Sequence, residues 1–387
     1  MWRRDFNPSI GYTDVFCFKI NLLYYIHMEV LYRKYRPTKF SEVIGQEHIV
    51  KVLEAEAKSG EISHAYLFSG TRGTGKTSVA RIFADAIGTS KNDIYEIDAA
   101  SNTGVEDIRT LNESVFTLPF ESKYKVYILD EVHMLSKSAS NALLKTLEEP
   151  PSHVVFILAT TETHKIPETV LSRCETYAFK KPSQEVLKKM VINVAKKEGF
   201  TMDDASAELV ALLGDGSFRD TQGIVQKILA YSKQPLEASG HTTTARLRTV
   251  VNGPMTNKKI SEEEVRLVTG APAVELVHCI ISAIAEKNLS LGLETVKKAV
   301  SQNIDMSIFM KLVLHTTRAV LLVRFGAEGI VKDDLSDKEF KFVTEMAKKD
   351  GVFSSQTLLE LLTAYERTTG AYIPQLPLEL ALLNIIK

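Results

Sequence analysis

The sequence predicts an α/β fold, with a helix-covered parallel sheet in the first half and two regions built from helices alone behind it. In the first half, apolar runs typical of buried strands alternate with segments whose apolar residues recur at helical spacing. This alternation is the pattern of a parallel sheet with helices on both faces. After Lys181 no further strand signal is found. The expected strands are residues 65–69, 94–97, 125–129 and 154–159, with 176–179 as an edge strand.

The composition agrees with a globular protein of two or three domains. The chain has 387 residues, of which 44% are hydrophobic and 25% charged, an ordinary balance for a soluble protein. The net charge of −1 argues against a globally basic nucleic-acid binder but leaves room for a local basic patch. Cys17, Cys174 and Cys279 show no C-x-x-C spacing. Neither a zinc site nor a disulfide framework is therefore indicated, and a reducing cytoplasm fits.

The octet Gly70-Thr71-Arg72-Gly73-Thr74-Gly75-Lys76-Thr77 is the most informative motif. It matches the phosphate-binding pattern G-x-x-x-x-G-K-[ST] and lies between a predicted strand and the predicted helix 79–87. Glycines let the backbone bend so that N–H groups point at phosphate oxygens, and the start of the helix adds partial positive charge. We expect Lys76 to reach the β- and γ-phosphates and Thr77 to ligate Mg²⁺. With Ser78, these residues form the expected nucleotide site.

Two predicted strands end in residues that suit catalysis beside such a loop. Strand 125–129 leads into Asp130 and Glu131, and strand 154–159 leads into Thr160. Asp130 would hold Mg²⁺ together with Thr77, and Glu131 would orient and polarise the attacking water. Thr160 could hydrogen-bond that water or the γ-phosphate, although a threonine at a strand end often caps a turn.

Two arginines have both a functional and an ordinary interpretation. Arg173 follows a short predicted helix at 167–171, and Glu175 is the obvious partner for a surface ion pair. Alternatively, Arg173 reaches a neighbouring subunit's γ-phosphate and stabilises charge in the transition state. Arg219 lies on the first turn of a helix that Ser217 can cap. It could reach over the nucleotide, or pair with Asp220 on the surface.

Shifts in composition divide the chain. Residues 1–27 read as a disordered or non-native upstream extension, with a partner-binding or membrane-touching arm as the alternative; their apolar stretch is too short to span a bilayer. The apolar stripes at 274–284 and 291–300 suit either a private helical core or an oligomerisation face. The expected units are 28–181 for nucleotide binding, 182–234 with helices 183–197, 203–213 and 218–231, a linker at 235–260, and a helical domain at 261–387.

Several long motifs then point to one family. The run DEVHMLSKSASNALLKTLEEPPSHVVFILATTETHKIPETVLSRC, residues 130–174, resembles the bacterial DNA polymerase III gamma/tau family, the clamp-loader ATPases. LYRKYRPTKFSEVIGQEHIV at 31–50, EIDAASNTGVEDIR at 96–109 and GSFRDTQ at 216–222 resemble it too. The resemblance is strong over residues 28–235 and looser beyond.

This resemblance implies an AAA+ module consisting of an ATPase domain, a three-helix lid and a collar that joins subunits in a ring. Such a chain uses ATP and Mg²⁺ and works in the cytoplasm, away from membranes, with copies of itself and with delta and delta-prime subunits. ATP binding opens a sliding clamp, and hydrolysis leaves the clamp on primer–template DNA. DNA contact belongs to the assembly. The stretch 101–104 is a helix start that could hold phosphates.

The matching positions also imply roles. Residues Gly70 to Thr77 are the Walker A loop, and Asp130-Glu131 is the Walker B pair. The resemblance makes Thr160 the first sensor, Arg173 an arginine finger acting in trans and Arg219 the second sensor. It also places Tyr35-Arg36-Pro37, through to Gly45-Gln46, beside the adenine.

The sequence departs from the family pattern in two respects, and three other functions stay open. Members of the family usually carry four zinc-binding cysteines between the phosphate-loop helix and the second strand. In this chain that connection runs from Gly88 to Ile94 and contains no cysteine, so we expect no zinc. The chain ends at Lys387, as expected for a short gamma form without the C-terminal domains of tau. The alternatives are a replication factor C-like small subunit, a non-catalytic scaffold like delta-prime, and a DExH-type helicase suggested by Asp130-Glu131-Val132-His133.

Overall fold

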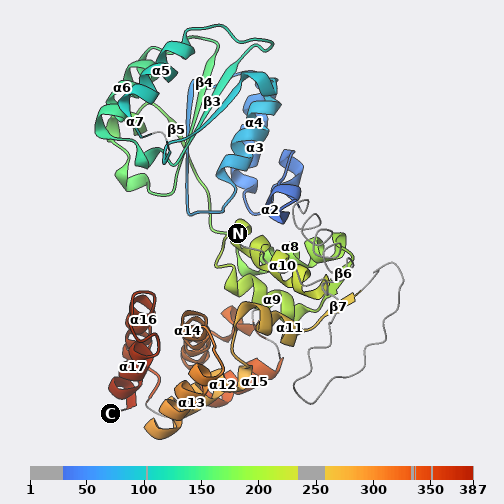
Figure 1. Ribbon diagram of the computed structural model, residues 1–387, viewed down its shortest axis with the longest axis vertical. Coiled ribbons are helices and arrows are strands. Elements are labelled where there is room, and N and C mark those ends of the chain that lie inside the picture. The colour runs from blue at the N-terminus through green and yellow to red at the C-terminus, as the bar shows by residue number, and fades with distance from the viewer. Residues whose placement is uncertain are drawn as a thin grey trace, which may run out of the picture.

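The computed structural model describes residues 29–101, 103–233, 258–332, 335, 337–349 and 352–386. Three units follow one another along its long axis, with the sheet at one end and the collar at the other (Figure 1). The expected extension at 1–27, Cys17 and most of the expected linker at 235–260 lie outside the described residues.

The first unit is built on a five-stranded parallel sheet with the order β2-β3-β4-β1-β5. The inner strands β1, β3 and β4 are almost entirely buried, as expected for apolar runs in a parallel sheet. All five predicted strands are therefore confirmed, and β5 lies at an edge as expected. Their bounds are β1 Ala65–Ser69, β2 Ile94–Asp98, β3 Lys125–Asp130, β4 Val154–Thr160 and β5 Glu175–Ala178.

Helices cover both faces of this sheet (Figure 1). On one face, Phe83 and Val79 of α4 and Leu53 of α3 share a core with the strands. On the other face, the core is shared with Leu111 of α5 and Leu143 of α6. The bounds are α3 Glu47–Ser59, α4 Lys76–Ala86, α5 Val105–Val115, α6 Lys137–Glu148 and α7 Glu168–Leu171, with short 3-10 turns including η3 Val132–Met134 and η4 Thr163–Lys165.

The second unit, the lid, has the three expected helices and a strand pair that the sequence did not reveal. Ser183, Asp203 and Ser217 cap the three helices through their side-chain oxygens, which satisfies backbone N–H groups at each start. The strands β6 and β7 pair in parallel; the expectation of no strand after Lys181 is thus wrong. The bounds are α8 Gln184–Lys197, β6 Phe200–Met202, α9 Asp204–Leu213, α10 Phe218–Lys233, β7 Lys258–Ile260 and α11 Glu262–Thr269.

Packing extends the lid beyond the expected boundaries at both ends. Leu31 of α2 (Leu31–Lys34) belongs to the lid core, and so do Ile260, Val265 of α11 and Ala271. These residues bury apolar surface against α8, α9 and α10, which is the main source of stability for short helices. The packing boundary with the last unit therefore lies near residue 271 rather than at 260.

The third unit, the collar, consists of helices joined by turns and loops, with no strand among its described residues. One core joins its helices, with Phe309 and Val313 of α14 near the centre. Helix α14 is long and apolar enough to cross a membrane by length and composition, yet half of its apolar window is buried within the collar. The bounds are α12 Val274–Ala285, α13 Leu289–Ser301, α14 Met306–Arg324, α15 Asp337–Ala347, α16 Ser355–Thr368 and α17 Leu376–Ile386.

Candidate functional site

The octet forms a loop between the end of β1 and the start of α4. Gly70, Gly73 and Gly75 have φ values of 146°, 74° and 102°, a region that side chains disfavour. At two of them there is also no room: a Cβ on Gly73 would lie 2.0 Å from the Ser217 hydroxyl oxygen, and one on Gly70 would lie 2.5 Å from the Phe179 carbonyl oxygen. No side chain caps the start of α4. Its first N–H groups therefore remain available for an anion.

A cavity of about 670 Å³ opens over this loop, between the sheet unit and the lid. The volume suits a small-molecule or cofactor site. Most of the predicted nucleotide-binding residues line it, whereas Gly70, Thr71, Thr160 and Arg173 do not. The described lining includes Tyr35, Arg36, Pro37, Arg72, Gly73, Thr74, Gly75, Lys76, Thr77, Ser78, Asp130, Glu131 and Arg219, with Tyr32 and Gln222 in addition.

Lys76 is held within the loop itself. Its ammonium group donates to the carbonyl oxygens of Gly70 at 2.7 Å and Thr71 at 3.0 Å, and the residue is only 5% exposed. Burial lowers the pKa of Lys76, and the nearby carboxylates of Glu131 and Asp130 oppose that shift. A buried ammonium group with few partners is well placed to exchange carbonyl contacts for phosphate oxygens.

The residues before and behind the loop fix its position. The Arg36 guanidinium donates from Nε to the Ser78 hydroxyl at 2.9 Å, and burial lowers the pKa of Arg36. Gln46, which has no exposed surface, donates to the Thr74 carbonyl at 3.4 Å and the Lys180 carbonyl at 2.7 Å. The segments expected beside the adenine thus contact the loop directly.

The lid also touches the phosphate loop. The backbone N–H of Phe218, the first residue of α10, donates to the Gly73 carbonyl at 2.9 Å. Arg219 on the next position lines the cavity, with its guanidinium 5.0 Å from the centre of the Tyr32 ring. Arg219 thus lies at the cavity rather than away from it, and the Tyr32 contact was not anticipated because the two residues are far apart in sequence.

The metal site expected from Thr77 and Asp130 is geometrically sound. The Thr77 hydroxyl donates to the Asp130 carboxylate at 2.7 Å, which leaves the lone pairs of the hydroxyl oxygen for a metal ion. Mg²⁺ commonly takes one or two protein oxygens and completes its shell with phosphates and water. This oxygen pair fits such an ion. No cluster of three or more His, Cys, Asp or Glu side chains that could hold a metal is present within the described ranges.

Glu131 lies next to Asp130 in a left-handed backbone conformation, with φ 52° and ψ 45°. Its carboxylate oxygen Oε2 accepts from the Thr161 hydroxyl at 3.0 Å and from the Thr161 N–H at 3.3 Å. A non-glycine residue in this region is uncommon and points to a functional constraint. Here it turns the carboxylate into the cavity wall.

Thr160 makes the turn-capping contact that was the alternative interpretation of this residue, and it does not line the cavity. Its side chain has no exposed surface, and its hydroxyl is engaged with the His133 ring at 3.1 Å and the Glu162 N–H at 3.0 Å. The neighbouring Thr161 is the threonine that contacts Glu131. Two adjacent threonines at a strand end project to different sides, and the sequence does not say which one faces the site.

Arg173 lies away from the cavity on the surface beside α7. It donates to the Glu148 carboxylate at 2.6 Å and to the Thr169 carbonyl at 2.6 Å. The expected partner Glu175 was wrong, because Glu148 at the end of α6 is brought beside Arg173 by the fold. In its own chain Arg173 therefore has no contact with the phosphate loop.

The helix start at 101–104 is described except for Asn102, and Gly104 takes the N-cap position of α5. Asp107 accepts from the Gly104 N–H at 3.2 Å, so one donor of this helix start is already satisfied.

Cys174 and Cys279 are free thiols.

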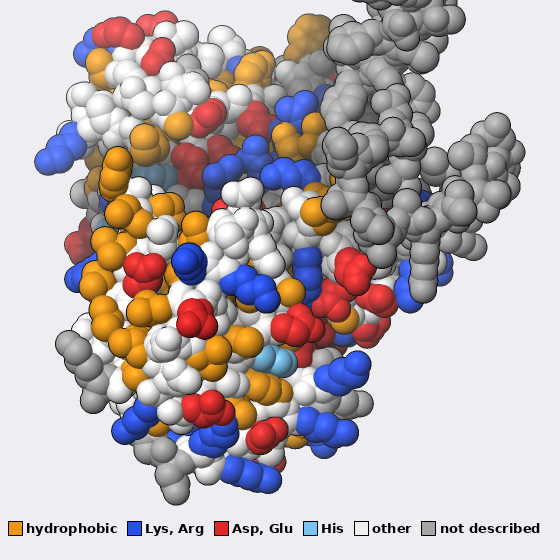
Figure 2. Space-filling model, turned by 60° about the horizontal axis from the view of Figure 1, so that its bottom comes forward, with side chains coloured by type: hydrophobic (Ala, Val, Ile, Leu, Met, Phe, Trp, Pro, Cys, Tyr) orange, Lys and Arg blue, Asp and Glu red, His pale blue; other side chains and the backbone are white. Residues whose placement is uncertain are grey.

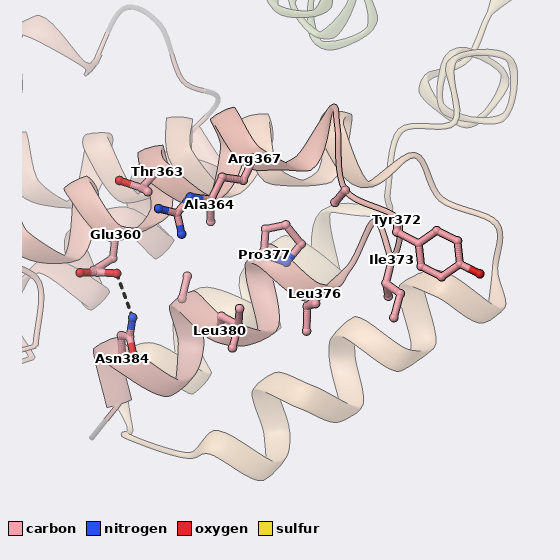
Figure 3. Close-up of a pocket in the computed structure, with 12 residues that line it drawn as sticks. Glu360, Thr363, Ala364, Arg367, Tyr372, Ile373, Leu376, Pro377, Leu380 and Asn384 are labelled. Atoms are coloured by element: carbon pink, nitrogen blue, oxygen red, sulfur yellow. Dashed lines mark hydrogen bonds between the residues drawn. The ribbon is translucent and has the colours of Figure 1, made fainter.

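A second concave surface lies on the collar, between α16 and α17. The groove measures about 370 Å³ and is lined mainly by apolar side chains, with Glu360 accepting from Asn384 at 3.1 Å across it (Figure 3). Tyr372 is fully exposed and Leu380 is 48% exposed. Figure 2, which brings this end of the molecule forward, shows apolar side chains spread between charged ones.

Fold and site together define the class of protein. A parallel sheet with this strand order carries a phosphate loop after β1 and an acidic pair after β3, and a helical lid closes over both. This is a P-loop nucleotide-binding module of the AAA+ type, as the sequence predicted.

Sequence comparison identifies the family. The profile described as DNA polymerase III, delta subunit, matches residues 45–102 and 89–183, and the profile of DNA polymerase III subunits gamma and tau domain III matches residues 260–387. The DNA polymerase III subunit tau of Bacillus subtilis is 34% identical over 380 residues, covering 92% of this chain and 63% of the relative. The gamma/tau subunit of Mycoplasma pneumoniae is 43% identical over 225 residues, covering 53% and 33%. This chain belongs to the DNA polymerase III gamma/tau family.

The chain spans between about a third and two thirds of the length of these relatives. Among solved structures, the RuvB Holliday junction branch migration motor of Thermotoga maritima aligns over 65% of this chain and 80% of its own, with a TM-score of 0.48 and 22% identity. That degree of likeness carries no inference about function.

Proposed function

We propose that this chain is an ATP-hydrolysing subunit of a bacterial clamp loader, which couples ATP turnover to opening a sliding clamp and placing it on primer–template DNA. The observation that carries this proposal is the convergence of Lys76, Thr77, Asp130 and Glu131 on one cavity, in a chain of the gamma/tau family. A non-catalytic scaffold would not need this complete set. A helicase of the DExH type would need a second large sheet, and the other sheet within the described residues has only two strands.

Binding would begin at the phosphate loop. The free N–H groups at the start of α4 and the Lys76 ammonium would receive the phosphates, and the aromatic and basic residues of 32–36 would face the base. Thr77 and Asp130 would hold Mg²⁺, which on binding neutralises charge on the β- and γ-phosphates. Arg36, anchored on Ser78, would keep the segment 35–37 against the site.

In hydrolysis, a water oxygen bonds to the γ-phosphorus while the bond from that phosphorus to the β–γ bridging oxygen breaks. Glu131, which lines the cavity next to the proposed metal ligand Asp130, would accept the water's proton. Its hydrogen bonds with Thr161 fix the carboxylate, and the neighbouring Thr160 stays the strand-end hydroxyl proposed as the first sensor. ADP departs with the electron pair of the broken bond, and phosphate is the second product.

Arg173 would complete the site of an adjacent subunit rather than its own. Its distance from its own cavity and its position at an exposed edge support this role. Arg219, carried by the lid helix that donates to Gly73, would sense the nucleotide and move the lid with it. The apolar groove between α16 and α17 supports a further element of the proposal: collar packing against a neighbouring subunit, either another copy or a delta or delta-prime partner.

The proposed function also implies particular cofactors and a cellular compartment for the chain. ATP and Mg²⁺ are the expected ligands, no zinc is expected, and the cytoplasm is the expected compartment. DNA contact through the assembly, rather than through this chain alone, stays a prediction.

The decisive experiment separates binding from hydrolysis. The chain, assembled with delta- and delta-prime-type partners, clamp and primed DNA, should hydrolyse ATP and load the clamp. Glu131→Gln removes the proton acceptor but keeps the side chain's size, so it should retain ATP binding and clamp opening. We expect its turnover to fall by about 10²-fold or more. A wild-type assembly without ATPase activity would refute the proposal.

A further inference from the structure

His133 is a buried histidine beside the site to which the proposed mechanism gives no task. It belongs to η3, immediately after the Asp130-Glu131 pair, and its side chain is 6% exposed. It does not line the nucleotide cavity. Both ring nitrogens nevertheless face polar groups, which is a costly arrangement to bury unless those groups are satisfied.

The ring contacts three groups on two segments. Nδ1 lies 3.1 Å from the Thr160 hydroxyl and 3.4 Å from Oε2 of Glu131. On the other side, Nε2 lies 3.4 Å from Oε1 of Glu162. Glu162 is itself fixed by Lys165 at 2.7 Å and has the exposed His164 at 3.6 Å.

Three consecutive residues at the end of β4, Thr160 to Glu162, contact the side chains of His133 and Glu131. Thr160 and Glu162 contact His133, whereas Thr161 donates to Glu131 through both its N–H and its hydroxyl. The backbone N–H of Glu162 also donates to the Thr160 hydroxyl at 3.0 Å. The side chains of His133 and Glu131 thus both contact the same short segment, residues 160–162.

The Glu131 carboxylate needs a hydrogen-bond donor from the His133 ring. The Oε2 atom of Glu131 is an acceptor only, so Nδ1 stabilises it only when Nδ1 carries the proton. A neutral ring carries one N–H: on Nδ1 it can point between the Thr160 oxygen and Glu131, and only a doubly protonated ring also donates from Nε2 to Glu162. A side chain without a donor at the Nδ1 position would leave Glu131 held by Thr161 alone.

We propose that His133 is a positioning residue for Glu131, holding its carboxylate at the cavity wall through a donor at Nδ1 that the buried Thr160 hydroxyl keeps in place. This inference rests on the proposed function, since it assigns the residue that orients the proton acceptor. His133 touches neither the phosphate loop nor the nucleotide cavity. Its loss should therefore affect turnover and leave nucleotide affinity unchanged.

Three substitutions separate hydrogen bonding from packing. In His133→Asn, the amide nitrogen can occupy the place of Nδ1 and donate to Glu131. In His133→Gln, the amide extends to the place of Nε2 and can reach only Glu162, and His133→Leu fills space without any donor. A merely structural role would favour the larger Gln and Leu side chains over Asn.

The measurements are kcat in the assembled clamp loader, the Kd for a fluorescent non-hydrolysable ATP analogue, and thermal unfolding as a check of folding. We expect Asn to keep kcat within about threefold of wild type, and Gln and Leu to lose about tenfold to a hundredfold, the scale of a misplaced catalytic group. The Kd should stay within about twofold throughout. His164→Ala, which removes an exposed ring beside the same Glu162, is the matched control and should match wild type.

Equal kcat for the Asn, Gln and Leu variants would overturn the inference, and so would an increase in Kd that accounts for the loss. A His164→Ala defect as large as that of His133→Leu would also overturn it. These outcomes are distinct from a failure of the proposed function. In that case the wild-type assembly would show no ATP turnover at all.

Discussion

The phosphate loop and the Arg173 edge are two parts of one proposed active site, and they are built in opposite ways. Around the loop, Lys76 is 5% exposed and its donors and neighbouring carboxylates converge on a single cavity. At the edge, the Arg173 side chain is 32% exposed and its guanidinium pairs with the half-exposed Glu148. Its contacts with Thr169, Ser172 and Glu148 hold it away from the nucleotide site of its own chain.

This difference indicates a division of labour. The groups proposed to bind nucleotide and polarise water lie in one chain and are held in place by partly buried hydrogen bonds within it, which keep their geometry without help from a partner. Arg173 is kept on the surface by an ion pair of the kind that contributes little to stability. Such a pair is easily exchanged for a phosphate on a neighbour.

Lys76→Ala tests the half of the proposed active site that lies within one chain, the phosphate loop and its carboxylates; this is the self-sufficient half. The ammonium group is the main cation at the loop, and charge-assisted hydrogen bonds to phosphate are strong. We expect ATP affinity of the chain alone to fall by on the order of a hundredfold or more, measured by equilibrium binding of a fluorescent ATP analogue. Lys165→Ala, which removes an exposed lysine outside the cavity lining, is the control. Unchanged affinity would mean that nucleotide binds elsewhere.

Arg173→Ala tests the other half. Removing an arginine finger costs on the order of 10³-fold in turnover, but only where a neighbour's phosphate is within reach. We therefore expect a loss of that size in the assembled clamp loader, with ATP affinity of the chain alone unchanged within about twofold. The readouts are steady-state ATPase and equilibrium binding.

The control for Arg173→Ala is Arg109→Ala, which also breaks a surface ion pair, here with Glu106, and should leave turnover intact. Full turnover of Arg173→Ala in the assembly would remove the proposed division between the two halves.

The self-sufficient half was also the easier one to predict from sequence. Strands β1, β3 and β4 are buried on both faces, so they read as continuous apolar runs with little ambiguity. The phosphate loop is a local motif, and its glycines are required because the backbone has a positive φ at Gly70, Gly73 and Gly75. Local signals of this kind survive without knowledge of the fold.

What failed depended on distant contacts or on too few residues. Strands β6 and β7 are three residues each, too short for any periodicity to register. Glu148 is 25 positions from Arg173, and only the packing of α6 beside α7 brings them together. Thr161, whose hydroxyl donates to Glu131, was not singled out, because two adjacent threonines at a strand end give no sign of which one faces which neighbour.

The smallest expected effect comes from the partner of Arg173. Glu148→Gln keeps the shape of the side chain but removes the charge that holds the guanidinium to its own chain. Because both side chains are partly exposed, the pair contributes little, and its loss should raise assembled turnover by at most about fivefold. The rise follows because Arg173 no longer has to leave an anion before it reaches a neighbour's phosphate. ATP affinity of the chain alone should not change.

The sign of this effect is what makes the experiment informative, with turnover measured beside the matched Glu106→Gln, whose arginine partner lies outside the proposed site. If Arg173 acts in trans, Glu148→Gln and Arg173→Ala must shift turnover in opposite directions, or Glu148→Gln must leave it unchanged. If both variants lose turnover together, the ion pair itself is the functional unit. Arg173 would then support α6 and α7 within its own chain, and the source of the missing catalytic cation would have to be sought on another edge of the subunit.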